Sequence, residues 1–240
     1  MIQLDNITKD YGSQRAVDGL SLDIARGTVF AFLGPNGAGK TTTIKMMVGL
    51  LRPTSGRLTL AGYDAVAQAR EAKSQVGFVP DQPELYDKLT GQEFLEFIAR
   101  MYALEPDDAR QQIERLAETF QLTKFYDRLA EGYSHGMKQR VAFAAALIHR
   151  PQILILDEPM VGLDPKTMRT VKNLLREESQ AGMTIFMSTH SLHVAEEVAD
   201  LIGVINLGRL LFLGSLTEMR QTMQSDGGNL EDLFLQLTGD

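Results

Sequence analysis

The segment from Gly34 to Thr41 constrains the fold of this chain more than any other stretch of its sequence. It fits the pattern G-x-x-x-x-G-K-[ST], in which glycines let a loop wrap closely around phosphate oxygens. A compact apolar run, Thr28 to Leu33, precedes the loop, and a segment of helical composition, Lys40 to Leu51, follows it. Strand, glycine-rich loop and helix in this order predict a βα unit of an α/β fold.

The chemistry that this loop offers is the binding of phosphate groups. Its backbone N–H groups can point inward, and the N-terminus of the following helix favours an anion. Lys40 is expected to neutralise the β- and γ-phosphates of a nucleotide, and the hydroxyl of Thr41 to ligate Mg²⁺. A turn that merely joins a strand to a helix explains the full match less well. The expected nucleotide-binding residues are Gly34, Pro35, Asn36, Gly37, Ala38, Gly39, Lys40, Thr41 and Thr42.

Two carboxylates end a second apolar strand later in the chain. Ile153–Leu156 is apolar at every position, as expected for a parallel strand covered on both faces, and Asp157 and Glu158 follow it. Ligands collect at the C-terminal edge of a parallel sheet, so Asp157 is predicted to meet the Mg²⁺ held by the phosphate loop. Glu158 can then orient or deprotonate an attacking water. Alone, such a pair is most often a solvated turn, but the phosphate loop favours the catalytic interpretation.

The remaining pattern divides the chain into sheet-forming and helical parts. Apolar residues recur at helical spacing between Pro83 and about His149, which predicts a helical subdomain inserted into an α/β core. Its helices are expected over Gly91–Tyr102, Asp107–Phe120 and Gly136–Ile148. Further helices are expected over Asp164–Gln180 and Asn229–Leu237. The other expected strands are Ile2–Ile7, near a sheet edge, Ser55–Ala61, Gln75–Val79, Thr184–Met187, and a hairpin of Leu201–Asn206 with Arg209–Leu213.

Composition limits the classes of function. The formal net charge of −7 disfavours a broad nucleic-acid-binding face, which is usually basic. Cysteine is absent, which excludes disulfides and zinc-thiolate sites. Apolar stretches such as Val141–Ile148 are far shorter than the roughly 20 residues that span a bilayer, and Met1–Tyr11 lacks the order of a signal peptide. We therefore expect one soluble, cytoplasmic domain of 240 residues with no nucleic-acid partner.

A segment between the phosphate loop and the two carboxylates indicates the protein family. Tyr133 to Arg140 precedes an alanine-rich helix and resembles the signature segment of ATP-binding-cassette (ABC) ATPases, usually L-S-G-G-Q followed by x-Q-R. Met160 to Asp164 resembles the D-loop of that family, Ser188 to His190 its switch histidine, and Tyr11-Gly12 its A-loop. Over essentially its whole length, the chain is similar to the ATP-binding subunit of an ABC transporter.

The resemblance implies a role for each matching residue. Ser134 and the N–H of Gly136 close over the γ-phosphate of ATP bound by a partner subunit, and Asp164 makes contacts across the dimer. Tyr11 stacks on adenine, and His190 contacts the γ-phosphate and the attacking water. The expected catalytic residues are Lys40, Glu158 and His190.

The resemblance also implies an architecture and partners. The expected fold is a P-loop NTPase core with a parallel sheet, an N-terminal antiparallel β portion and the helical subdomain, with 1–82 and 150–240 forming the core around 83–149. The cofactors are ATP and Mg²⁺, and the working unit is a homodimer or heterodimer of ATP-binding subunits. A separate integral membrane permease holds this subunit on the cytoplasmic face. The tail, similar to the ending of exporter-type subunits, favours export.

The signature segment departs from the family pattern, because Tyr133, His135 and Met137 replace Leu, Gly and Gln. A left-handed backbone at the first glycine position costs another residue on the order of 1 kcal/mol. His135 nevertheless keeps its backbone N–H, so ATPase activity is expected to be retained. The Q-loop residue that reaches Mg²⁺ or water is either Asp81 or Gln82, of which the alignment favours Asp81.

Two other functions stay open. The first is a soluble, non-transport ABC ATPase of translation, repair or iron–sulfur assembly, which the single phosphate loop and the net acidity disfavour. The second is a nucleotide-gated interaction module without turnover, which the presence of Lys40, Glu158 and His190 disfavours.

Overall fold

The phosphate loop directly follows β3, a central strand of a six-stranded sheet. The strand order of this sheet is β10-β9-β3-β8-β7-β6. The computed structural model describes residues 1–224 of the chain. All neighbouring strands of this sheet are parallel except β10, which runs antiparallel to β9. The strands are β3 (Val29–Leu33), β6 (Val76–Val79), β7 (Ile153–Asp157), β8 (Thr184–Thr189), β9 (Leu201–Asn206) and β10 (Arg209–Gly214).

A second, antiparallel sheet has the order β2-β1-β4-β5. Its strands are β1 (Ile2–Tyr11), β2 (Gln14–Ile24), β4 (Ser55–Leu60) and β5 (Tyr63–Asp64). The first strand lies near the edge of this sheet, as expected, because β1 pairs with the edge strand β2 on one side and with β4 on the other. Strand β2, which follows β1 after a tight turn at Gly12, was not among the expected strands.

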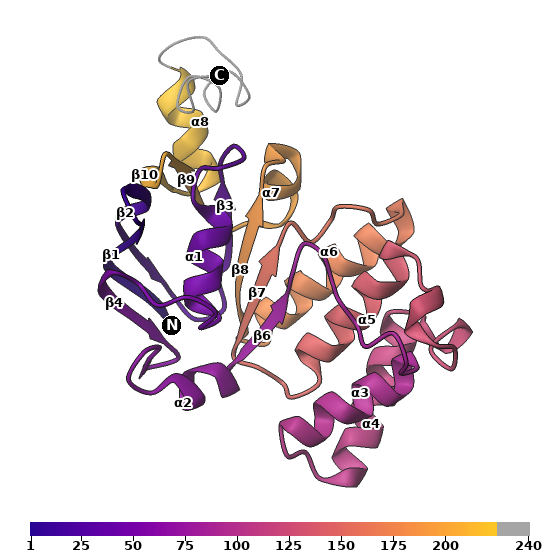
Figure 1. The fold of residues 1–240 in the computed structure, drawn as a ribbon. Helices are drawn as coiled ribbons and strands as arrows, with labels where there is room; N and C mark the ends of the chain where they lie inside the picture. Colours follow the sequence, from indigo (N-terminus) through magenta and orange to yellow (C-terminus); the bar gives the residue numbers. More distant parts are fainter. Residues whose placement is uncertain (225–240) are drawn as a thin grey trace.

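Both faces of the six-stranded sheet are covered, as the uniformly apolar strands require. Side chains alternate along β7, so Ile153 and Ile155 pack with α1 (Lys40–Met47) and the antiparallel sheet. Leu154 and Leu156 point to the opposite face and pack with α5 (His135–Leu147) and α6 (Pro165–Gln180). Figure 1 shows α1 and α6 on opposite sides of the strands. This arrangement holds the C-terminal ends of β3, β7 and β8 at one edge.

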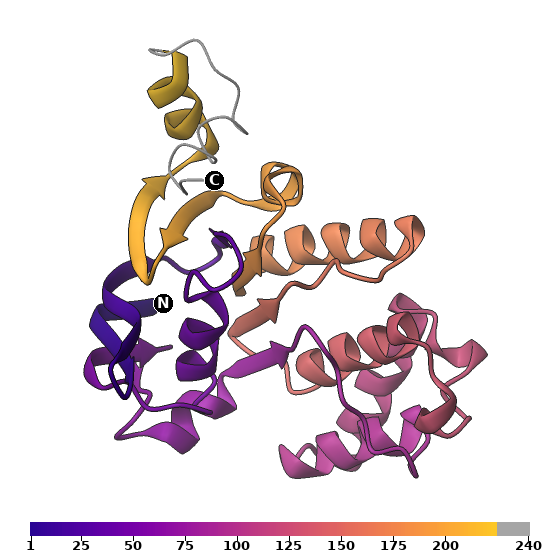
Figure 2. The same ribbon diagram turned by 45° about the horizontal axis from the view of Figure 1, so that its top comes forward.

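The other helices flank these layers. Figures 1 and 2 show α3 and α4 beside α5, on the side of the molecule away from the antiparallel sheet. A capping box fixes the start of α3, since Thr90 Oγ1 accepts from the amide of Glu93 and the Glu93 carboxylate accepts from the amide of Thr90. The remaining elements are α2 (Ala69–Ser74), α3 (Gly91–Met101), α4 (Pro106–Thr119), α7 (Leu192–Val198), α8 (Leu216–Gln224), and the short 3₁₀ turns Leu122–Lys124 and Ala130–Gly132.

The bounds of most of the expected elements agree closely with those in the structure. Helix α1 ends at Met47 rather than Leu51, because the chain turns at Gly49, whose φ is +69°. Helices α2, α7 and α8 and the short strand β5 had no counterpart among the expected elements, and the helix expected over Asn229–Leu237 lies outside the described residues. Between residues 1 and 224, no helix combines the length and apolar character needed to cross a membrane.

Candidate active site

The phosphate loop turns back on itself between β3 and α1. Gly37 and Gly39 have φ angles of +82° and +111°, in the region that favours glycine. A Cβ atom at Gly39 would lie 2.7 Å from the carbonyl oxygen of Ala16, so this position has no room for a side chain. A Cβ at Gly37 would meet nothing within 4 Å, because this residue faces open space. The loop therefore presents its backbone directly to whatever lies in front of it.

A cavity of about 210 Å³ lies in front of the loop. Its walls combine loop residues with carboxylates that end β7 or follow β6 and β7, as expected for the C-terminal edge of a parallel sheet. The lining residues are Ala16, Pro35, Asn36, Gly37, Gly39, Lys40, Thr41, Thr42, Asp81, Asp157 and Glu158.

Lys40 supplies a buried positive charge at this cavity. Its Nζ donates to the carbonyl oxygens of Gly34, at 2.6 Å, and Pro35, at 3.2 Å. It also lies 3.8 Å from Oε1 of Glu158. Burial lowers the pKa of Lys40, while the negative charge of Glu158 opposes that shift. An ammonium group held in this way by carbonyl oxygens is suited to a strongly anionic ligand such as a polyphosphate.

Asp157 lies at the end of β7 and is buried. Its Oδ1 accepts a hydrogen bond of 2.6 Å from Oγ of Ser188 on the neighbouring strand, and the carboxylate also interacts with the hydroxyl of Thr41. Burial raises the pKa of Asp157, and these two hydroxyl groups act in the opposite direction. Ser188 is a site residue whose contact with Asp157 was not predicted. The register that sets it opposite Asp157 is a property of the folded sheet.

Glu158 occupies an uncommon backbone conformation for a residue with a side chain, with φ at +47°. Its amide donates to Oγ of Ser188 at 3.1 Å, which holds this turn against β8. Its Oε2 lies 3.0 Å from Nδ1 of His190, and since a carboxylate only accepts, Nδ1 carries the proton of this hydrogen bond. His190 is 59% exposed, so it reaches the site from the solvent side.

The residues expected to hold Mg²⁺ divide into two groups. Thr41, Asp157 and Asp81 line the cavity, whereas Gln82 is exposed and is not part of its lining. In the described part of the chain, no group of three or more His, Cys, Asp or Glu side chains could hold a metal ion by itself. Mg²⁺ commonly takes one or two carboxylates together with substrate phosphates and waters, and Asp157 with Thr41 fits that donor set.

The other expected nucleotide-contacting residues lie outside this cavity. Ser134 caps α5 by accepting from the amide of Met137. Asp164 caps α6 through the amides of Lys166 and Thr167, both at 3.0 Å. Tyr11 is 47% exposed on the surface. One chain thus builds the cavity in front of the glycine-rich loop, and Ser134 and Asp164 are not part of its lining.

Comparison with known proteins decides the family. Residues 17–161 match the family described as ABC transporter. This chain belongs to the ABC transporter family. It is 37% identical over 238 residues to the linearmycin resistance ATP-binding protein LnrL of Bacillus subtilis, which covers 99% of this chain and 75% of that protein. It is 38% identical over 212 residues to the bacitracin transport ATP-binding protein BcrA of Bacillus licheniformis, covering 88% and 68%.

Solved structures of ABC proteins share the fold. The ATP-binding subunit of an ABC transporter superposes with a TM-score of 0.93 at 30% identity, covering 99% of both chains. A dimeric ATP-binding cassette in a post-hydrolysis state with ADP and Pi gives a TM-score of 0.79 at 27% identity, covering 90% of this chain and 99% of that one. The chain is accordingly an ATP-binding ABC subunit and an ATPase, and the expected α/β P-loop fold is confirmed.

Proposed function

We propose that this chain hydrolyses Mg²⁺-bound ATP at the interface of a dimer of ATP-binding subunits and so drives a membrane permease. The observation that carries the proposal is the convergence of Lys40, Asp157 and Glu158 on the cavity of the phosphate loop, with His190 bonded to Glu158. A lysine and two carboxylates that line one cavity, with a histidine bonded to one of the carboxylates, are groups that phosphoryl transfer to water requires.

Each of these residues has a distinct task in the proposed reaction. Lys40 and the backbone of the loop hold the β- and γ-phosphates, while Thr41 and Asp157 hold Mg²⁺, with Asp81 within reach of it or of water. The metal supplies charge stabilisation for the transferred phosphoryl group when it is bound. Glu158 orients the attacking water and accepts its proton. His190 donates through Nδ1 to Glu158 and so keeps that carboxylate aimed at the water.

The proposal of a dimer rests on three expected ATP-contacting residues that are absent from the cavity lining. Ser134, Gly136 and Asp164 do not line it, so a second subunit would have to present its own signature and D-loop segments to complete the site. The dimeric cassette that this chain resembles supports such an arrangement. Either a second copy of this chain or a related subunit can fill that place, with Tyr11 stacking on adenine at the outer edge.

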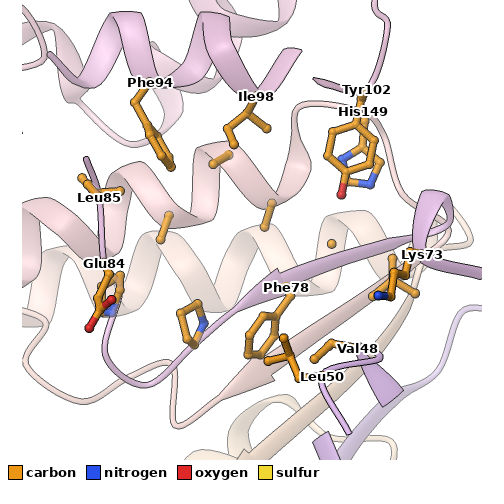
Figure 3. Close-up of a pocket in the computed structure, with 17 residues that line it drawn as sticks. Val48, Leu50, Lys73, Phe78, Glu84, Leu85, Phe94, Ile98, Tyr102 and His149 are labelled. Carbon is orange, nitrogen blue, oxygen red and sulfur yellow. The ribbon is translucent and has the colours of Figure 1, made fainter. Parts of the chain in front are cut away.

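An apolar groove of about 330 Å³ is a suitable place for the permease. We propose that 83–149 form a helical subdomain set between the core segments 1–82 and 150–240, and the groove runs between the two parts. Figure 3 shows Phe94 and Ile98 of α3 pointing into the groove, with Phe78 of β6 and Leu50 on the opposite wall. A short amphipathic helix presented by the permease would bury its apolar face there.

The direction of transport is proposed from the relatives. Resistance to linearmycin and transport of bacitracin are functions in the names of two similar proteins, and both are consistent with removal of a compound from the cell. We therefore propose that the permease works as an exporter and holds this subunit at the cytoplasmic face of the membrane.

The first test uses Glu158→Gln, which should bind ATP but hydrolyse it slowly. Its mass in solution is expected to double when Mg²⁺ and ATP are added, because the closed dimer accumulates. Wild-type protein is expected to hydrolyse ATP, with Lys40→Ala as the inactive control. A wild-type rate no higher than that of Lys40→Ala would contradict the proposed catalytic site. A monomeric Glu158→Gln that binds ATP would contradict homodimerisation and leave a partner subunit as the source of the second signature segment.

A further inference from the structure

His135 lies between two segments that both belong to the proposed dimer-facing machinery. It is the first residue of α5, directly after the capping Ser134. Its Nε2 lies 3.3 Å from the carbonyl oxygen of Val161 in the D-loop segment of the same chain. Because the carbonyl only accepts, Nε2 carries a proton here, and both the neutral ring and the imidazolium can donate in this way.

The ring also fits against a glycine of the D-loop segment. Gly162 has a φ of +74°, and a Cβ built on it would lie 2.4 Å from Cδ2 and 3.0 Å from Nε2 of His135. A Cβ at this distance would require the exposed imidazole to shift, so the absence of a Cβ at position 162 makes room for the ring where it lies. His135 replaces the glycine usual at this signature position, and its ring occupies the space beside Gly162.

A backbone hydrogen bond connects this contact to Glu158, a carboxylate residue of the candidate active site. The amide of Val161 donates to the carbonyl oxygen of Glu158 at 3.2 Å, closing the turn that follows the strained Glu158 backbone. The peptide groups of Val161 are therefore held at one end by Glu158 and at the other by His135. A displacement of the signature segment would be transmitted through this turn to the residue that we propose as the base.

We infer that His135 is a positioning residue that ties the signature segment to the D-loop and Glu158 within one subunit. This inference rests on the proposed role of Glu158. When ATP held by the partner subunit contacts the signature segment of this chain, His135 would pass the movement to Glu158 of this chain. Glu158 belongs to the other ATP site of the dimer, so the two sites would be linked through His135 and Gly162.

A double-mutant cycle of ATPase kinetics tests the link, with the full-length proteins wild type, His135→Gly, Gly162→Ala and the double variant. Gly162→Ala adds a Cβ that collides with the imidazole, so its kcat is expected to fall. Removing the ring should relieve that collision, so the double variant is expected to exceed Gly162→Ala in kcat by at least about threefold, within the range of couplings between touching residues. The KM for ATP should change by a smaller factor than kcat, because the residues that line the phosphate-loop cavity are untouched.

Gly62→Ala is the matched control. Gly62 also has a left-handed φ, +86°, but a Cβ there would meet nothing within 4 Å. This variant carries the backbone strain without the collision, so its effect on kcat is expected to be the same in the wild-type and His135→Gly backgrounds. Equal fold-losses for Gly162→Ala in those two backgrounds would overturn the inference.

If Gly162→Ala fails to fold, His135→Gly alone still tests the inference. This variant only removes side-chain atoms, so it introduces no new steric clash. Its kcat is expected to fall at least about threefold, by a larger factor than KM for ATP changes, and an unchanged kcat would overturn the inference. The two proposals fail differently. A wild-type rate equal to that of Lys40→Ala removes the catalytic site itself, whereas an active wild type with an additive cycle removes only the role of His135.

Discussion

The hydroxyl of Ser188 donates to Oδ1 of Asp157 over 2.6 Å. The hydroxyl oxygen of Ser188 also accepts from the amide of Glu158, so one small side chain orients both carboxylate residues of the site. The bond to Asp157 favours its charged form against the burial that raises its pKa. If Asp157 holds Mg²⁺ as proposed, Ser188 keeps its carboxylate charged and oriented for the metal.

Ser188→Ala is expected to raise the Mg²⁺ concentration that the ATPase reaction requires. A hydrogen bond to a charged group is worth about 1.5–3 kcal/mol, which corresponds to a rise of about tenfold or more in the Mg²⁺ concentration for half-maximal ATPase activity. A magnesium titration at saturating ATP measures this. Ser179→Ala is the control, because Ser179 lies outside the site and its hydroxyl bonds to the carbonyl oxygen of Arg176. A titration identical to wild type would show that Asp157 needs no orientation from Ser188.

Tyr133→Phe is expected to destabilise the fold. The buried hydroxyl of Tyr133 accepts from the amide of Gly91 at 3.0 Å and lies within donating distance of the carbonyl oxygens of Phe125 and Arg128. The variant leaves these backbone groups without that partner, at a cost of about 1–3 kcal/mol in unfolding free energy. Chemical denaturation provides the measurement. Tyr126→Phe, a half-buried tyrosine packed on the same core, should cost less, and equal losses would contradict this role.

The pH dependence of stability is expected to include a contribution from His149. Its ring stacks on Tyr102 with 3.7 Å between centroids, and burial lowers the pKa of His149 to about 4. Between about pH 6.5 and pH 4 the unfolded chain binds a proton there that the folded chain does not, so stability falls as pH falls through this range. From pH 7.5 to pH 5 the loss attributable to His149 is about 2 kcal/mol.

His149→Phe removes this contribution while keeping an aromatic ring against Tyr102. Denaturant unfolding at pH 7.5 and pH 5 should show a smaller loss of stability for the variant than for wild type. His193→Gln is the control, because that side chain is 78% exposed and does not contact the stacked pair of His149 and Tyr102. The prediction is contradicted if wild type and His149→Phe lose the same stability over this interval.

Those parts of the site that depend on local order could be predicted from the sequence. The phosphate loop and the carboxylates at the end of β7 each lie within one short segment whose apolar run and turn residues are visible in the sequence. Strand β2 was missed because charged residues and glycine interrupt its alternation, and its partner in β1 is what makes it a strand. Contacts between segments, such as Ser188 with Asp157 or His135 with Gly162, depend on register and packing that no single segment encodes.

The backbone of Glu158 stores strain that a substitution can release. A left-handed φ costs a residue with a side chain about 1–2 kcal/mol, whereas the greater freedom of glycine in the unfolded chain costs about 0.4–1 kcal/mol. Glu158→Gly is therefore expected to be more stable than Glu158→Gln by about 0.5–1 kcal/mol. Both variants lose the negative charge beside Lys40, but only glutamine keeps a side-chain oxygen that can accept from His190, so the measured difference is a lower bound for the backbone strain.

Equilibrium denaturation of the two nucleotide-free variants measures that difference. The same pair of substitutions at Glu177, an exposed position inside α6, is the control, and there the order should reverse because glycine disfavours a helix by about 1 kcal/mol. If Glu158→Gly were the less stable variant, as at Glu177, the turn after β7 would carry no strain. If it is the more stable one, the positive φ at Glu158 is maintained at the expense of stability, which is expected where the turn must aim a carboxylate at a reacting water.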